Sequence, residues 1–184
     1  NDFWERAEFP FQIVHKLAKL NLVGDGIEGY GCPPMSPIAA GLVNMELNRG
    51  DGSVGTFHGV HCGLAMKSIA MLGSAEQKHR WLPPMARLEK IGAFALTEPG
   101  SGSDAGSLSS SATPDGDGWR INGTKQWITN GSHAGTFLVF VRTDVTRRGT
   151  RGVSAFLVDG ADVEVTREEE KLGLNSSSTA DIRF

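Results

Sequence analysis

The sequence predicts an α+β protein in which an all-helical half is followed by an antiparallel β-barrel or sandwich. Two observations carry this prediction. Up to about residue 90, apolar residues recur at the three- and four-residue spacing of amphipathic helices. From residue 91 on, short runs rich in β-branched and aromatic residues alternate with Gly, Asn and Asp. We therefore expect two domains, residues 1–90 and residues 91–184, with the boundary near Lys90.

Composition excludes several classes of protein. The 184 residues hold 18 Lys and Arg against 21 Asp and Glu, so the chain is slightly acidic and is not expected to bind nucleic acid. Two cysteines, Cys32 and Cys62, are too few for a disulfide scaffold or a four-cysteine zinc ribbon. No apolar stretch of about 18 residues is present, so no membrane partner is expected. Because the chain starts without Met and stops in an alternating apolar run, we expect a fragment of a longer polypeptide.

Helix boundaries are indicated by proline and serine in the first half. Pro10 fits a first-turn position before an apolar series of Phe11, Val14, Leu17 and Ala18. Ser36 followed by Pro37 predicts an N-cap and an N1 proline, with one face formed by Ile38, Leu42 and Met45.

The next helical signals lie close together. Residues 54–72 are apolar nearly all round, which predicts the most buried helix, and Gly73 should end it. Residues 74–77 match a capping box for a further short helix. Pro83 and Pro84 are then expected to break that helix.

In the second half, Asn122-Gly123 between two strand-like runs predicts a β-hairpin, because both turn positions tolerate positive φ. A serine-rich tract occupies residues 107–112. The predicted strands are residues 93–96, 119–122, 125–129, 137–143, 153–158 and 163–167.

Two motifs in the helical half resemble ligand sites. Residues 24–29 fit G-x-G-x-x-G, but they follow a helix and cannot open the helix that a dinucleotide fold requires, so a helix-to-helix loop is the better interpretation. His58, His61 and Cys62 could place two metal ligands on one helical face. No H-E-x-x-H pattern accompanies them, so we interpret the histidines as packed core residues and assign no metal.

Two segments in the β half carry the strongest functional signals. Residues 94–104 run from a strand into a loop with two glycines and three hydroxyls, which suits a phosphate or a polar ring or forms an ordinary turn. Trp127 and Thr129 lie on the same side of a strand, where an indole and a hydroxyl suit a flat heteroaromatic ligand. A core tryptophan beside a threonine is the alternative.

Together these segments resemble the acyl-CoA dehydrogenase family over essentially the whole chain. The resemblance rests on Leu96-Thr97-Glu98-Pro99, Gly102-Ser103-Asp104 and Trp127-Ile128-Thr129-Asn130, with Gly73 to Lys78, Trp81-Leu82-Pro83 and Lys171-Leu172-Gly173. It implies an N-terminal helical domain, a middle β-barrel domain and a C-terminal helical bundle that is missing here. Residues 7–10 and 29–33 resemble the glutaryl-CoA dehydrogenase branch, which includes short-chain acyl-CoA oxidases of plant peroxisomes.

The resemblance also implies FAD as cofactor and α,β-dehydrogenation of an acyl-CoA thioester. Carried over by position, Phe94, Leu96 and Thr97 would line the isoalloxazine, Trp127 and Ile128 would pack against it, and Thr129 would reach flavin N5. Gly102 and Ser103 would lie by the pyrophosphate and the CoA chain, Ser103 also serving substrate binding. Phe94 stands where several relatives carry Tyr, so a hydroxyl contact is lost there.

The resemblance places the catalytic glutamate beyond Phe184, so no catalytic residue is assigned and the fragment itself is expected to be inactive. Glu98 is expected to be a structural member of the flavin loop. The implied partners are acyl-CoA, an electron-transfer flavoprotein or another acceptor, and copies of the chain in a homotetramer or homodimer. The implied compartment is the cytoplasm of a bacterium, or the mitochondrion or peroxisome of a eukaryote. Alternatives are an acyl-CoA oxidase using O₂, and a non-catalytic module that binds a CoA ester or a protein.

The expected substrate is a short-to-medium monocarboxylic acyl-CoA. Glutaryl-CoA dehydrogenases carry an arginine for the distal carboxylate shortly after the segment that matches residues 46–49, and Gly55 stands at its place. No Lys or Arg occurs between Arg49 and Lys67. A buried carboxylate without a cation is strongly unfavourable, so Gly55 predicts an apolar acyl tail.

Overall fold

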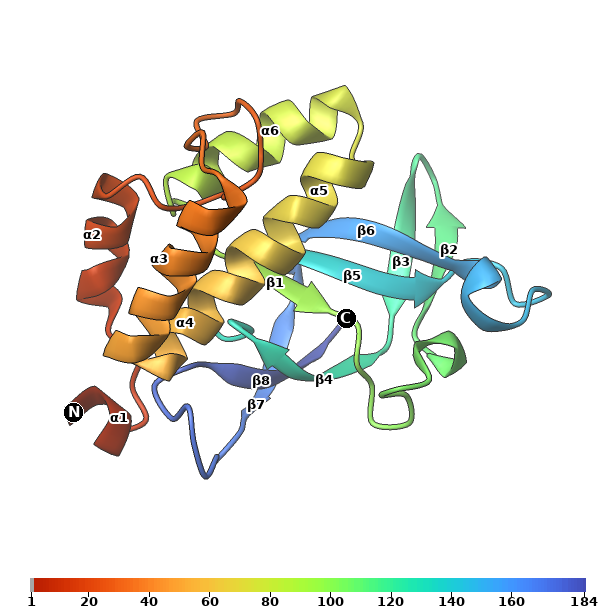
Figure 1. The fold of residues 1–184 in the computed structure, drawn as a ribbon. Helices are drawn as coiled ribbons and strands as arrows, with labels where there is room; N and C mark the ends of the chain where they lie inside the picture. The colour runs from red at the N-terminus through yellow and green to blue at the C-terminus, as the bar shows by residue number, and fades with distance from the viewer. Residues whose placement is uncertain (1) are drawn as a thin grey trace.

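The computed structural model describes residues 2–184, in which a layer of helices packs on a β domain (Figure 1). This arrangement confirms the predicted order of a helical half and a β half. None of the helices in this described part is long and apolar enough to cross a membrane. The α-helices are α1 (Asp2–Glu5), α2 (Val14–Lys19), α3 (Pro37–Gly50), α4 (Gly52–His58), α5 (Lys67–Leu72) and α6 (Ala75–Ala86).

Serine caps start two of these helices, as predicted. The Ser36 hydroxyl accepts a hydrogen bond from the Ala39 N–H at 3.2 Å, ahead of Pro37 in the first turn of α3. At α6 the capping box is complete. The Gln77 N–H donates to Ser74 Oγ at 3.1 Å, and the Ser74 N–H donates to Gln77 Oε1 at 2.8 Å. These bonds satisfy helix N–H groups that have no partner within the helix.

One long helical run crosses the molecule and packs on strand β1 (Gly92–Ala95) (Figure 1). It consists of α4, a π-helical segment (Gly59–Met66) and α5, and Gly73 ends it as predicted. One side is buried, whereas Met71 and Leu72 on the other are 71% and 81% exposed. The buried side includes Phe57, Cys62, Ala65, Met66 and Ile69.

The predicted break at Pro83 and Pro84 is wrong, because both prolines lie inside α6, which continues to Ala86. Each proline costs the helix one N–H donor. Both lie in the last turn and their carbonyls still accept, from Arg87 N at 3.3 Å and Glu89 N at 2.9 Å. Burial of four side chains of α6 offsets the loss: Trp81, Leu82, Met85 and Ala86.

The β domain consists of two sheets. One has the order β1-β5-β2-β3 with β6 on β5, and the other has the order β4-β8-β7. Most pairings are antiparallel, but β1 and β2 each pair with β5 in parallel. Strand β2 was not predicted, because its serine, threonine and proline do not form a hydrophobic run. The remaining bounds are β2 (Ser111–Asp115), β3 (Gly118–Asn122), β4 (Thr124–Thr129), β5 (Thr136–Arg142), β6 (Val153–Asp159), β7 (Glu164–Glu168) and β8 (Thr179–Arg183).

The predicted hairpin at Asn122-Gly123 is wrong. Strand β3 pairs with β2 in one sheet, and β4 pairs with β8 in the other, so the chain changes sheets at Gly123. Gly123 has a φ of +152°, and a Cβ there would lie 2.1 Å from Ser110 Oγ. The two-residue hairpin turn is instead Gly116-Asp117 between β2 and β3, with Gly116 at φ +59°.

Side-chain hydrogen bonds join the helical half to the β half. His61 Nε2 lies 3.0 Å from the carbonyl oxygen of Met85, and its Nδ1 accepts from the Gly92 N–H at 2.9 Å. The Asn130 amide donates to the carbonyl oxygens of Phe57 at 3.3 Å and Gly92 at 3.1 Å. The boundary near residue 90 falls between α6 and β1 and stays a prediction.

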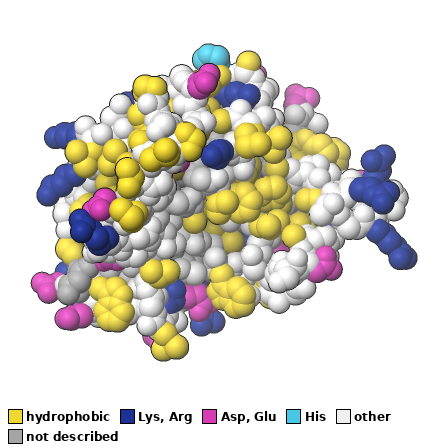
Figure 2. Space-filling view, viewed as in Figure 1, with side chains coloured by type: hydrophobic (Ala, Val, Ile, Leu, Met, Phe, Trp, Pro, Cys, Tyr) yellow, Lys and Arg dark blue, Asp and Glu magenta, His cyan; other side chains and the backbone are white. Residues whose placement is uncertain are grey.

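Apolar side chains remain on the surface of both halves. Ile38, Leu42 and Met45 share one face of α3, as their spacing predicts, but all three are exposed. A second group of hydrophobic side chains lies over β5 beside α5 (Figure 2). Contiguous apolar surface of this kind marks a contact region in soluble proteins.

Candidate functional site

A cavity of about 210 Å³ lies between the long helical run and the strands β1 and β4. It brings together six of the eight cofactor residues that the resemblance implied. Sequence reasoning missed two further lining residues, because their place on the wall depends on how the helix packs on β1. The lining residues are Phe94, Leu96, Thr97, Trp127, Ile128, Thr129 and the unforeseen Val60 and Leu64.

Two hydrogen bonds join the loop after β1 to strand β4 beside the cavity. The Gln126 N–H donates to the carbonyl oxygen of Thr97 at 2.8 Å. The Lys125 ammonium donates to the carbonyl oxygen of Leu96 at 3.1 Å. The loop that follows β1 is therefore fixed to β4 at the place where the cavity opens.

A buried ion pair lies directly behind the cavity wall. Lys125 Nζ is 2.7 Å from Glu98 Oε1, and the two side chains are 0% and 2% exposed. The Glu98 carboxylate also accepts from the N–H groups of Ser109 and Ser110 and from the Ser109 hydroxyl. Burial opposes ionisation of Glu98, but the hydrogen bonds from Lys125 and the serines outweigh it and lower its pKa to about 2. This geometry agrees with a structural role for Glu98, since its carboxylate faces inward.

Trp127 owes its orientation to a β-bulge in β4. Between Lys125 and Ile128, β4 carries one residue more than β8, so two residues oppose Asp181. Trp127 has the left-handed φ of +59°, and its N–H donates to Asp181 Oδ1 at 3.2 Å. Regular alternation would place Trp127 on the buried face with Lys125. The extra residue turns the indole outward, where it is 59% exposed and lies with Thr129 on the cavity.

The cavity fits the flat heteroaromatic ring of a flavin. Aromatic and aliphatic side chains supply apolar walls, and Trp127 supplies an indole face. The hydroxyls of Thr97 and Thr129 line the same space, and neither is hydrogen-bonded within residues 2–184. Two free hydroxyls beside an apolar slot can bond the polar edge of such a ring.

Three predicted residues lie outside this cavity. Gly102 and Ser103 are exposed in the loop after β1, and the neighbouring Ser101 hydroxyl donates to the Asp104 carbonyl at 2.8 Å. Gly55 is buried in α4, where a Cβ would come within 2.3 Å of the Asn48 side chain. Their roles toward cofactor and substrate stay predictions.

A larger cavity of about 740 Å³ lies between α6 and the strands β3 and β6. None of the predicted site residues lines it. Its walls include Arg80, Trp81, Trp119 and Phe156. We place the functional site at the smaller cavity, because the hydroxyl of Thr97 in the loop after β1 meets the indole and hydroxyl of Trp127 and Thr129 on β4 there.

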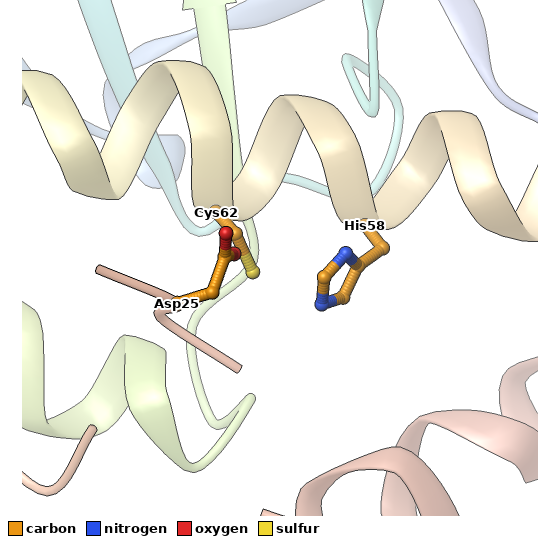
Figure 3. Close-up of side chains that lie close together, drawn as sticks. All are labelled: Asp25, His58 and Cys62. Atoms are coloured by element: carbon orange, nitrogen blue, oxygen red, sulfur yellow. The ribbon is translucent and has the colours of Figure 1, made fainter. Parts of the chain in front are cut away.

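His58 and His61, on the long helical run, are buried, as the packed-core interpretation expects. His58 and Cys62 project from the long helical run toward the loop that carries Asp25 (Figure 3). His58 Nε2 lies 3.1 Å from the Leu22 carbonyl oxygen, and Cys62 Sγ accepts from the Gly24 N–H at 3.3 Å. Burial raises the pKa of the Cys62 thiol to about 12. These contacts tether the glycine-rich loop, in which the predicted helix-to-helix connection is confirmed.

Comparison with known proteins agrees with this geometry. Residues 1–89 match the acyl-CoA dehydrogenase N-terminal domain, and residues 93–184 match the acyl-CoA dehydrogenase middle domain. The chain belongs to the acyl-CoA dehydrogenase family. It is 40% identical over 182 residues to the mitochondrial short-chain specific acyl-CoA dehydrogenase of Rattus norvegicus, covering 96% of this chain and 43% of that protein.

Solved acyl-CoA dehydrogenase structures superpose on nearly the whole chain. The acyl-CoA dehydrogenase of Geobacillus kaustophilus has a TM-score of 0.94 and 34% identity, covering 100% of this chain and 49% of that one. A glutaryl-CoA dehydrogenase of Mycobacterium smegmatis in complex with FADH2 has a TM-score of 0.90 and 36% identity, covering 99% and 46%. This acyl-CoA dehydrogenase chain thus spans about half the length of the relatives it matches.

Proposed function

We propose that the whole protein is an FAD-dependent acyl-CoA dehydrogenase that converts an acyl-CoA thioester to the trans-2-enoyl-CoA. The observation that carries the proposal is the convergence of Thr97, Trp127 and Thr129 on one apolar cavity. The glutaryl-CoA dehydrogenase of Mycobacterium smegmatis, which shares this fold, is described in complex with FADH2. That complex supports a flavin as the ligand of this cavity.

When bound, FAD would accept the hydride from the β-carbon of the substrate. The protein residues would bind and orient the ring: Trp127 would pack on it, while Thr97 and Thr129 would offer hydroxyls to its polar edge. Val60 and Leu64 would contribute apolar surface beside the bound ring. Glu98 is engaged by Lys125 and is not the base, so the base is assigned to no residue of this chain.

The acyl group is proposed to be a short-to-medium monocarboxylic chain. By the family resemblance, Gly55 stands where the glutaryl enzymes carry an arginine, and no Lys or Arg occurs between Arg49 and Lys67. A carboxylate at the end of the acyl chain would therefore find no cation on this stretch. The relative from Rattus norvegicus is described as short-chain specific, which supports this choice.

The whole protein also needs an electron acceptor, an assembly and a compartment, which we propose as follows. Reoxidation of the flavin requires an electron acceptor, for which we propose an electron-transfer flavoprotein. A homotetramer or homodimer is proposed as the assembly. The proposed compartment is the bacterial cytoplasm, or the mitochondrion or peroxisome of a eukaryote.

The decisive experiment replaces Trp127 in the whole protein. Trp127→Ala should lose flavin or shift its visible spectrum, because the ring loses its packing face. Trp119→Ala is the matched control, since Trp119 is 50% exposed, lies on β3 and lines the other cavity. Unchanged flavin content and spectrum in Trp127→Ala would refute the site.

Substrate choice is tested separately by steady-state kinetics on butyryl-CoA, hexanoyl-CoA and glutaryl-CoA. We expect kcat/KM to be higher for the two monocarboxylic substrates. A clear preference for glutaryl-CoA would show that another cation holds the distal carboxylate.

A further inference from the structure

The bulge in β4 leaves a backbone group that needs a partner outside the sheet ladder. Trp127 has a left-handed backbone, which is uncommon for a bulky residue and is maintained only where its surroundings fix it. Because of the extra residue, the Trp127 N–H has no ladder carbonyl to bond. It donates instead to the carboxylate of Asp181, the β8 residue opposite the bulge, at 3.2 Å.

The second N–H of the bulge serves the other wall of the cavity. Gln126 donates to the carbonyl oxygen of Thr97 at 2.8 Å. The bulge therefore orients both walls: one N–H holds the loop with Thr97, and the other is held by Asp181. If Trp127 returned to regular alternation, its indole would point to the face on which Lys125 is buried.

We propose that Asp181 is a positioning residue: its carboxylate holds the Trp127 peptide N–H and thereby keeps the indole on the cavity beside Thr97 and Thr129. This inference rests on the proposed flavin site. Asp181 itself does not line the cavity, so it acts through the backbone of Trp127. Its own backbone is fixed on the far side, where the Thr166 hydroxyl donates to the Asp181 carbonyl at 3.1 Å.

The test compares Asp181→Ala and Asp181→Asn in the whole protein loaded with flavin. Alanine removes the acceptor, so hydrogen exchange of the Trp127 amide should become faster by roughly tenfold, as expected for loss of one bond to a charged acceptor. The flavin spectrum should shift in the same direction as in Trp127→Ala. Asparagine keeps an acceptor oxygen at the same place and should restore both the exchange rate and the spectrum.

Two controls separate positioning from general stability. Glu164→Ala removes a carboxylate from the neighbouring strand, where it pairs with Arg183, and should change neither measurement. Asp181→Val also removes the acceptor, but valine favours strands, so this variant should give the same results as Asp181→Ala. It takes the place of Asp181→Ala if the alanine variant does not fold.

The outcomes distinguish the two proposals. If Trp127→Ala shifts the spectrum but Asp181→Ala and Asp181→Val do not, the positioning role is wrong and the flavin site stands. If Asp181→Asn is as impaired as Asp181→Ala, the hydrogen bond is not what positions the indole. If Trp127→Ala itself leaves the spectrum unchanged, the flavin contact is wrong and the positioning role falls with it.

Discussion

Lys125 Nζ lies 2.7 Å from Glu98 Oε1, and the pair joins the loop after β1 to β4 at a place that water does not reach. Removing one partner leaves the other charge buried and unpaired. Glu98→Gln and Lys125→Met should each destabilise the protein by about 3–5 kcal/mol. The double variant should recover much of that loss, as measured by urea unfolding. A double variant as unstable as the sum of the single ones would contradict this coupling.

His61 predicts how stability depends on pH. Burial lowers its pKa to about 4, and the bonds to Met85 and Gly92 need the neutral ring with its proton on Nε2. Between pH 6.5 and 4 the unfolded chain binds a proton that the folded chain does not, so stability falls as pH falls. His61 should make the free energy of unfolding about 2 kcal/mol lower at pH 5 than at pH 7.

Urea unfolding at the two pH values tests this expectation. His61→Gln should be less stable at pH 7 but should show a shallower dependence on pH. His79→Gln, on the exposed side of α6, is the matched control and should keep the dependence of the unchanged protein. The same slope in His61→Gln and in the unchanged protein would assign the effect to other groups.

Gly123 should not tolerate a side chain. A Cβ would lie 2.1 Å from Ser110 Oγ and 2.8 Å from Ser110 Cα, so Gly123→Ala should cost about 1–3 kcal/mol of stability. Gly118→Ala is the control, because the nearest atom to its Cβ would be 3.8 Å away. Equal melting temperatures of the two variants would show that the corner between the sheets relaxes without cost.

The 184-residue chain alone is expected to show no dehydrogenation of butyryl-CoA with an artificial electron acceptor. Abstraction of the α-proton needs a positioned base, and Glu98 is held by Lys125. Flavin binding should also be weaker than in the whole protein, because buried contacts are lost. Measurable turnover by this chain would overturn the assignment of the base to another part of the protein.

Local signals in the sequence correctly predict where α3 and α6 begin. The caps at Ser36 and Ser74 depend on bonds within three residues, so the residues themselves determine them. The hairpin at Asn122-Gly123 was wrong because turn chemistry fixes backbone angles but not which strand becomes the neighbour. Here β3 pairs with β2, which precedes it directly along the chain, and β4 pairs with β8, which is distant in sequence.

The site was predicted only in part for the same reason. Phe94, Thr97, Trp127 and Thr129 could be singled out by residue type and by the family resemblance, and the structure brings them together. The bulge could not be foreseen, because it is a mismatch in length between β4 and β8. Simple alternation along β4 correctly predicts that Trp127 and Thr129 share a face. It also predicts that Lys125 lies on that face, whereas Lys125 is buried and Trp127 is exposed.

The hydrogen bonds between the two halves have a consequence for synthesis on the ribosome. His61 and the Phe57 carbonyl emerge early in translation, whereas their partners Gly92 and Asn130 belong to segments made later. Polar groups of the helical half that are buried in the finished fold therefore lack their partners until Gly92 and Asn130 leave the exit tunnel. A pause in translation before β4 would prolong that interval and increase the demand for chaperones.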